Sequence, residues 1–165
     1  MSIKRISPCL WFDTQAEEAA RFYVSVFKNS RIAAVTRFPD AGNEIHGKPA
    51  GSVMVVDFEL NGQPMTALNG GPQFTFSEAI SLQVECETQE EIDYYWNALS
   101  EGGDPRAQQC GWLKDKYGLS WQVIPSGMSE MMKDHGSGEA KRAMSAMLQM
   151  KKIDIGALRR AAAGN

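Results

Sequence analysis

The stretch DTQAEEAARFY, residues 13–23, returns in outline as ETQEEIDYYWN, residues 87–97. Both copies begin with an acidic residue, a Thr and a Gln, and both place a Glu three positions after the Thr. The first pair is Thr14 and Glu17, and every match lies 74 positions from its counterpart. A Thr-x-x-Glu sequence before a helical pattern is the capping box that begins many helices. We therefore predict a helix after each copy.

The same order of elements surrounds each copy. In the first half we predict a strand at residues 3–12, the helix, and strands at 31–38, 52–60 and 63–68. In the second half we predict a strand at 80–86, a helix that ends at Gly102-Gly103, and strands at 107–113 and 119–124. Apolar residues at helical spacing define both helices. The repeated order, together with the constant offset, favours an internal duplication.

Turn signals and a methionine-rich tail complete the pattern. Asn61-Gly62 is typical of a hairpin turn, and the Gly- and Pro-rich residues 39–51 predict a projecting loop. The tail carries large flexible side chains at helical spacings, namely Met128, Met131, Met132, Met144, Met147, Leu148 and Met150. Such a stripe favours soft packing against the parent domain or a partner subunit, and a promiscuous binding surface is the alternative.

Composition excludes several classes of protein. The net charge of −3 and pI near 5.4 argue against nucleic-acid binding, which needs a concentrated basic face. The three cysteines are far apart, with no C-x-x-C pair, which argues against a disulfide framework and fits a reducing compartment. No run of residues has the apolar length of a membrane span or a signal segment. We therefore expect a cytoplasmic protein with neither a membrane nor a nucleic-acid partner.

These elements predict an α+β fold. It consists of two tandem strand–helix–strands modules, followed by a C-terminal helical tail. The predicted bounds are residues 1–70 and 71–126 for the modules and 127–165 for the tail, in one compact domain overall.

Three long motifs carry a family resemblance: SPCLWFDTQAEEAARFYVSVF (residues 7–27), LNGGPQF (68–74) and CGWLKDKYGLSWQVIP (110–125). With AMLQMKKIDIGAL in the tail, they resemble the PhnB-like branch of the vicinal oxygen chelate superfamily, which includes glyoxalase I, bleomycin-binding proteins and fosfomycin-resistance enzymes. The resemblance implies that the two modules are tandem βαβββ modules forming a cupped mixed β-sheet, in an α+β fold, and that the protein is a homodimer. The branch is also labelled 3-demethylubiquinone 3-methyltransferase. The sequence does not support that label, because it lacks the glycine-rich turn and βαβα alternation of a nucleotide-type methyltransferase.

The resemblance also implies where a metal would bind. Enzymes of the superfamily hold a divalent metal with His, Glu or Gln side chains from the first and last strand of each module. The corresponding positions here are Ser7, Thr66 or Asn69, Ser81 and Gln122. Hydroxyls and one amide are poor ligands for a transition metal, and both histidines, His46 and His135, lie outside these strands. We therefore predict no metal and no cofactor.

The remaining side chains predict a ligand-binding cup lined by aromatic rings, amides and a hydroxyl. The candidate ligand-binding residues are Trp11, Asn69, Phe74, Ser81, Gln83, Trp112 and Gln122. They suit a small, aromatic or apolar organic molecule bound without a metal. No catalytic residue can be named. The alternatives are an enzyme of the superfamily (a lyase, isomerase or transferase), with Asp57, Glu59 and Glu85 as candidate acids and bases, and a structural or regulatory dimer.

Overall fold

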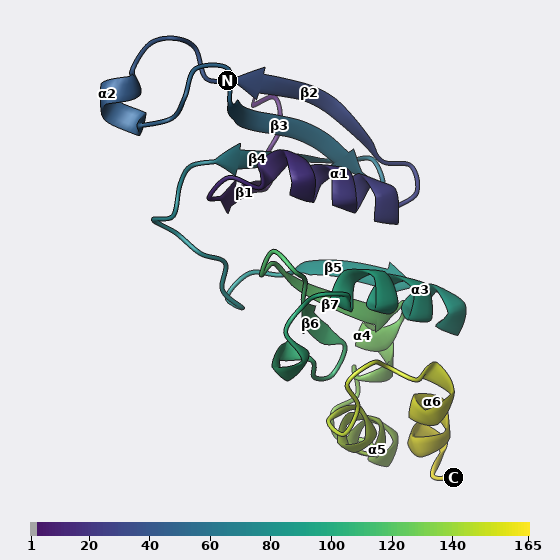
Figure 1. Ribbon diagram of the computed structural model, residues 1–165. Helices are drawn as coiled ribbons and strands as arrows, with labels where there is room; N and C mark the ends of the chain where they lie inside the picture. The colour runs from purple at the N-terminus through teal and green to yellow at the C-terminus, as the bar shows by residue number, and fades with distance from the viewer. Residues whose placement is uncertain (1–2) are drawn as a thin grey trace. The chain divides into compact units, whose positions relative to one another are not determined.

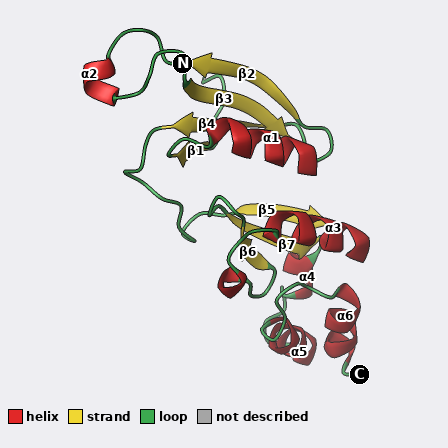
Figure 2. Cartoon of the chain, in the orientation of Figure 1, coloured by secondary structure: helices red, strands yellow, loops and turns green. Residues whose placement is uncertain are grey.

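The computed structural model describes residues 3–165, which form two compact units. The first unit runs to Thr75 and the second from Phe76 to Asn165, and each contains a sheet with a helix packed against it (Figures 1 and 2). The first unit contains β1 (Cys9–Phe12), α1 (Ala16–Val26), β2 (Arg31–Arg37), α2 (Asn43–His46), β3 (Val53–Leu60) and β4 (Gln63–Asn69).

The first sheet has the strand order β1-β4-β3-β2. β1 and β4 are parallel, and the other two pairs are antiparallel. The predicted hairpin is confirmed: Asn61 and Gly62 join β3 to β4 with φ values of 47° and 80°, which a type I′ turn requires. The predicted projecting loop is also found, and it contains the short helix α2 (Figure 1). The first strand was predicted too long, because Ile3 and Ile6 are exposed and lie outside β1.

Helix α1 covers one face of this sheet with a stripe of small and aromatic residues. Ala16, Ala19, Ala20 and Tyr23 are all fully buried, and the Tyr23 ring stacks on Phe58 of β3 with ring centroids 6.4 Å apart. The alanines let the helix approach the sheet closely, and alternate residues of β3 and β4 fill the space between them. Burial of this apolar layer is what holds the first unit together.

The two predicted capping boxes have different outcomes. In the second unit the Thr88 hydroxyl accepts a hydrogen bond from Glu91 N at 3.2 Å, as predicted. In the first unit Thr14 makes no such bond, so that prediction is wrong. Helix α1 begins after Gln15 without a side-chain cap from its own segment, and its Ala16 N–H donates instead to Asn69 Oδ1, at 2.8 Å, on the last residue of β4.

This difference predicts unequal effects of two matched substitutions. Thr88→Ala is expected to lower the free energy of unfolding by about 1 kcal/mol, because one N-terminal N–H of the helix loses its acceptor. Thr14→Ala is expected to change it by less than about 0.5 kcal/mol, since the side chain is exposed and caps nothing. Urea unfolding followed by circular dichroism measures both, and equal losses would contradict the assignment of the caps.

The second unit repeats this arrangement with one strand fewer. It contains β5 (Leu82–Cys86), α3 (Gln89–Ser100), the 3₁₀ helix η1 (Pro105–Ala107), β6 (Trp112–Lys114), β7 (Ser120–Pro125), α4 (Met128–Met131), α5 (Gly138–Met147) and α6 (Ile155–Ala163). The sheet order is β5-β7-β6, with β5 and β7 parallel and β6 antiparallel to β7. The α+β fold of two βαβββ-like modules with C-terminal helices is therefore confirmed, although the second sheet lacks an equivalent of β2 among the described residues.

The missing strand has a simple cause. Residues 101–111 connect α3 to β6, less than half the length of the segment 27–52 that holds β2 in the first unit. The predicted strand at 107–113 is therefore wrong over most of its length. Its residues instead form a tight turn, in which Gln109 and Trp112 exchange both main-chain hydrogen bonds.

The C-terminal tail bonds to this turn and to α3. Cys110 N and Gly111 N donate to the carbonyls of Met150 and Lys151, each at 2.8 Å. The Gln89 side chain accepts from Ile155 N and donates to the carbonyl of Ile153. None of the tail's methionines is buried; its buried residues are Ala140, Ala143, Ile153, Ile155, Leu158 and Ala162. Met144 is exposed and the other methionines of the tail are half-buried, so they pack only partly within this unit, and packing against a partner subunit stays a prediction. No helix among residues 3–165 is long and apolar enough to span a membrane.

Candidate functional site

Each sheet turns one face toward its helix and the other face away from it. Because side chains alternate along a strand, the residues facing away from α1 and α3 are set by the register of the ladders. We call these two surfaces the polar faces. In the first sheet the polar face includes Cys9, Trp11, Asp57, Glu59 and Thr66. In the second it includes Gln83, Glu85, Trp112, Lys114, Ser120, Gln122 and Ile124.

The polar face of the second sheet brings together several of the predicted ligand-binding residues. Gln122 lies in the middle, paired in the ladders with Gln83 on one side and Trp112 on the other. Its Nε2 donates to Ser81 Oγ at 2.9 Å, and its Oε1 accepts from Gln83 Nε2 at 3.4 Å. Gln83 is exposed and Trp112 half-buried. The arrangement presents an indole beside two amides and a hydroxyl, which is a surface for a flat molecule with polar substituents.

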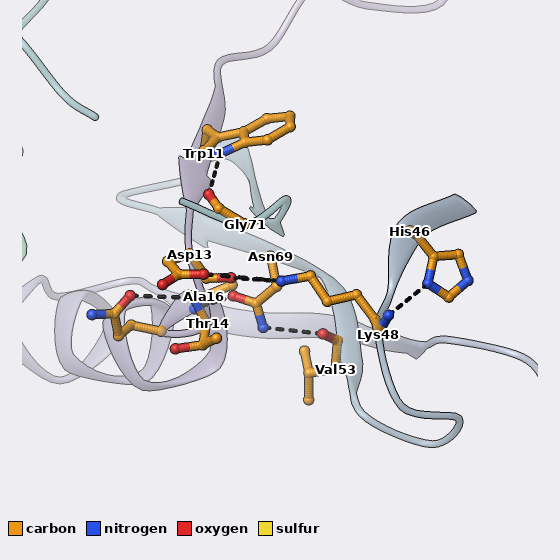
Figure 3. A network of polar contacts seen from close by, with 10 residues as sticks. Trp11, Asp13, Thr14, Ala16, His46, Lys48, Val53, Asn69 and Gly71 are labelled. Atoms are coloured by element: carbon orange, nitrogen blue, oxygen red, sulfur yellow. Dashed lines mark hydrogen bonds and ion pairs between the residues drawn. The ribbon is translucent and has the colours of Figure 1, made fainter. Parts of the chain in front are cut away.

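Trp11 and Phe74 meet in the first unit. The Trp11 indole Nε1 donates to the Gly71 carbonyl at 2.8 Å (Figure 3), and its ring contacts Phe74 edge to face with centroids 5.0 Å apart. Gly70 makes this possible, because a Cβ at that position would lie 2.2 Å from the indole. The pair therefore forms an aromatic cluster at the end of β4.

Asn69 does not lie with these residues. It pairs with Phe12 in the ladder and so points to the α1 side, where it is buried. Both ends of its amide bind main chain: Oδ1 accepts from Ala16 N at 2.8 Å, and Nδ2 donates to the Val53 carbonyl at 3.0 Å (Figure 3). Each end of the amide thus makes one main-chain hydrogen bond on the α1 side, so Asn69 ties α1 to β4 and faces away from Trp11 and Phe74, with which it was expected to line the ligand site.

A cavity of about 380 Å³ lies next to Asn69, at the start of α1. Its charged residues are Asp13, Glu17 and Lys48. The Lys48 ammonium lies 3.9 Å from Asp13 Oδ1, and Glu17 is held by Arg21 at 2.6 Å. The loop before Lys48 is tied by His46, whose Nδ1 accepts from Lys48 N at 2.9 Å (Figure 3). Asp13 pairs with Lys48, and Glu17 pairs with Arg21, so the cavity offers a mixed-charge lining rather than a set of free ligands.

The predicted metal positions do not fit a transition metal. The register separates the two alternatives in the first module: Thr66 lies opposite Cys9 on the polar face, whereas Asn69 lies on the other. The Thr66 hydroxyl donates to Asp57 Oδ1 at 3.0 Å. In the second module the donors are the hydroxyl of Ser81 and the amide of Gln122, already bound to each other. Neutral hydroxyls and one amide are weak ligands, and no three His, Cys, Asp or Glu side chains within residues 3–165 gather as an alternative site.

The thiols on these strands are poor nucleophiles. Burial, followed by the charge of Asp57, raises the pKa of Cys9 above its usual value. Burial, followed by the charge of Glu91, raises the pKa of Cys86 to about 11. A thiol must ionise to attack, so both shifts oppose covalent catalysis near neutral pH.

Two further residues of the second polar face, Lys114 and Ser120, were not among the predicted site residues. Lys114 follows Trp112 by two positions and so shares its face, and its Nζ lies 2.5 Å from Glu78 Oε1. Ser120, opposite Lys114 in the ladder, is buried, and its hydroxyl has no hydrogen-bond partner in the part of the chain that the structure describes. The alternation Trp-Leu-Lys could have placed Lys114. No sequence signal shows that Glu78, in the segment before β5, reaches it.

Comparison with known proteins agrees with this architecture. Residues 4–124 match the model of the family described as 3-demethylubiquinone-9 3-methyltransferase. The PhnB protein of Bacillus cereus is 37% identical over 74% of this chain and 100% of its own, with a TM-score of 0.63. No protein of curated function matches the chain.

Two more distant structures share the fold alone. A protein from Pseudomonas aeruginosa is 21% identical over 73% of this chain and 96% of its own, with a TM-score of 0.57. The fosfomycin resistance protein FosX of Listeria monocytogenes, in a structure with Mn(II) and sulfate ion, is 12% identical over 82% of this chain and 99% of its own, with a TM-score of 0.50. The chain belongs to the PhnB/3-demethylubiquinone-9 3-methyltransferase family, which has the glyoxalase/bleomycin resistance, or vicinal oxygen chelate, fold.

Proposed function

We propose that this protein binds a small, aromatic or apolar organic molecule without a metal. The observation that carries the proposal is the polar face of the second sheet, where Trp112 lies beside the hydrogen-bonded group of Ser81, Gln83 and Gln122. An indole offers a flat apolar surface for stacking. The amides offer donors and acceptors at its edge, and such a combination orients a ring through its substituents.

The chemistry of the donor set supports binding without a metal. A Lewis acid that polarises a substrate oxygen needs anionic or imidazole ligands to hold it, and Ser, Thr and Gln occupy the positions concerned. This chain's residues therefore supply stacking and hydrogen bonds to a ligand.

The family description names a demethylubiquinone, a substituted quinone ring. A ring of this kind suits a surface of one indole and two amides. Methyl transfer is less well supported, because the described residues form two mixed sheets of four and three strands. The doubly wound parallel sheet of nucleotide-type methyltransferases has a different strand order and helices on both faces. We propose ligand binding, and not methyl transfer, as the activity.

The proposal is tested with metal analysis and one neutral probe. We expect protein purified without chelator to contain far less than one transition metal per subunit. We expect 2-naphthamide to perturb the Trp112 indole signal in an NMR titration, and Trp112→Leu to weaken this binding about tenfold. The matched control is Tyr94→Leu, because Tyr94 is an exposed aromatic residue on α3. This variant should leave the affinity for 2-naphthamide unchanged. Stoichiometric metal together with binding abolished by EDTA would overturn the proposal.

A further inference from the structure

The polar face of the second sheet has a chemical gradient along its strands. Its middle row consists of Gln83, Gln122 and Trp112, side by side across β5, β7 and β6. One step along, Ile124 lies beside Glu85, whose carboxylate would repel an anion. One step in the other direction, Ser120 lies beside Lys114, whose ammonium would attract one. A ligand with one anionic end therefore has a preferred orientation on this face.

Ser120 carries a buried hydroxyl that could bind a ligand. Its side chain is 1% exposed, yet its hydroxyl makes no hydrogen bond within the described residues. Buried polar groups are nearly always paired, because an unpaired one loses its bonds to water without replacement. The ladder places this unpaired hydroxyl directly opposite Lys114. A hydroxyl donor and an ammonium at neighbouring positions are suited to share one carboxylate.

The ammonium of Lys114 is already bound to a carboxylate, that of Glu78, at 2.5 Å. Glu78 lies in the connecting segment before β5, outside any helix or strand, and its side chain is 64% exposed. This hydrogen bond is the main reason that the pKa of Glu78 lies below its usual value. The Lys114 side chain is half-buried and the Glu78 side chain is mostly in solvent, and an ion pair with so exposed a carboxylate contributes little stability, so a competing carboxylate can replace Glu78 at small cost.

The spacing also suits an aromatic acid. Trp112 and Lys114 are two residues apart on one strand, which separates their Cα atoms by about 7 Å. That is roughly the length of a fused aromatic ring system with a carboxylate at one end. The ring would lie on the indole and the amides, and the carboxylate would reach Lys114 and Ser120.

We propose that the second sheet takes an acidic aromatic ligand, whose carboxylate binds Lys114 and Ser120 in place of the Glu78 carboxylate. The inference rests on the proposed function, since it names the class of ligand for the same face. Glu78 then acts as an internal competitor that occupies the anion position until a ligand arrives.

A matched pair of probes, 2-naphthoate and 2-naphthamide, tests the inference by NMR titration of the full chain. We expect Glu78→Gln to strengthen binding of naphthoate about two- to fivefold, because the competing charge is removed. We expect Lys114→Met to weaken it about tenfold and Lys114→Arg to retain it. Naphthamide should change less than twofold in all three variants. Ser120→Ala should weaken naphthoate binding without lowering the stability of the protein, since the hydroxyl it removes has no partner.

The control is a second Lys–carboxylate pair of equal length. Lys152 Nζ lies 2.5 Å from Oδ1 of Asp93, a residue of α3. Asp93→Asn and Lys152→Met remove the same charges as Glu78→Gln and Lys114→Met, but at a place away from the polar face. Both should leave naphthoate binding unchanged. If Glu78→Gln and Lys114→Met have no larger effect than these controls while naphthamide still depends on Trp112, the inference is overturned and the proposed function stands. If neither probe binds, both are overturned.

Discussion

Replacing Asp115 with alanine is expected to lower the free energy of unfolding of the second unit by about 4 kcal/mol. The carboxylate is 3% exposed and lies in the turn between β6 and β7. Its Oδ1 accepts from Tyr117 N at 2.8 Å and Leu119 N at 3.1 Å, and its Oδ2 accepts from Trp121 Nε1 at 2.8 Å. Alanine would remove the carboxylate that accepts from all three donors, two of which belong to buried residues, and would open a space beside the Trp121 ring.

Urea unfolding, with hydrogen exchange of the β6 and β7 amides, measures this loss. Asp115→Asn should destabilise less than alanine, because an amide oxygen still accepts in the same place. Asp104→Ala is the control: Asp104 also accepts from a main-chain N–H two residues on, at 2.9 Å, but it lies in a solvent-exposed turn. Its removal should shift the midpoint far less. Equal shifts for the two alanine variants would show that the buried network does not stabilise the unit.

Asn69→Leu is expected to destabilise the first unit by about 3 kcal/mol. Leucine has a similar volume but no polar atoms. It would take away the oxygen that accepts from the Ala16 N–H and the amide N–H that donates to the Val53 carbonyl. The first turn of α1 would lose its attachment to β4. We expect faster hydrogen exchange at the start of α1 and a lower urea midpoint.

Gln15→Leu provides the comparison at the same helix end. Gln15 occupies the position of the cap in the sequence, yet its side chain is exposed and reaches only the Thr14 N–H, at 3.3 Å. This variant should change stability by less than about 0.5 kcal/mol. A loss as large as that of Asn69→Leu would mean that α1 is capped locally, and that the contact with β4 adds nothing.

The features that the sequence predicted well are those set by short-range patterns. The offset of 74 positions relates β1 to β5, since Cys9 and Gln83 occupy equivalent places beside Thr66 and Gln122. The alternation of side chains placed the polar faces correctly, because a strand has a period of two whatever its partners are. The hairpin was predictable because Asn61 and Gly62 tolerate the positive φ values of its turn.

The features that could not be predicted from the sequence depend on contacts between distant segments. Thr14 resembles Thr88 in sequence, but the first N–H of the helix, that of Ala16, binds the side-chain amide of Asn69, which lies 53 residues beyond Ala16. Asn69 was assigned to the ligand site because the register of β4 could not be fixed from the sequence, and a shift of one residue reverses the face. The contact of Glu78 with Lys114 likewise depends on the path of an irregular segment.

The hydrogen bonds from Cys110 and Gly111 to Met150 and Lys151 bear on the order in which the protein can mature on the ribosome. The first unit has all its strands once residue 69 has been synthesised. The second unit has its last strand once residue 125 has been synthesised. The main-chain N–H groups of Cys110 and Gly111 and the side chain of Gln89, however, form hydrogen bonds with residues 150–155, which are synthesised later. Domains generally fold as they are completed, N-terminal first. The nascent chain therefore carries a first unit with all its strands while the second unit still lacks hydrogen-bond partners, which exist only once residues 150–155 have been synthesised.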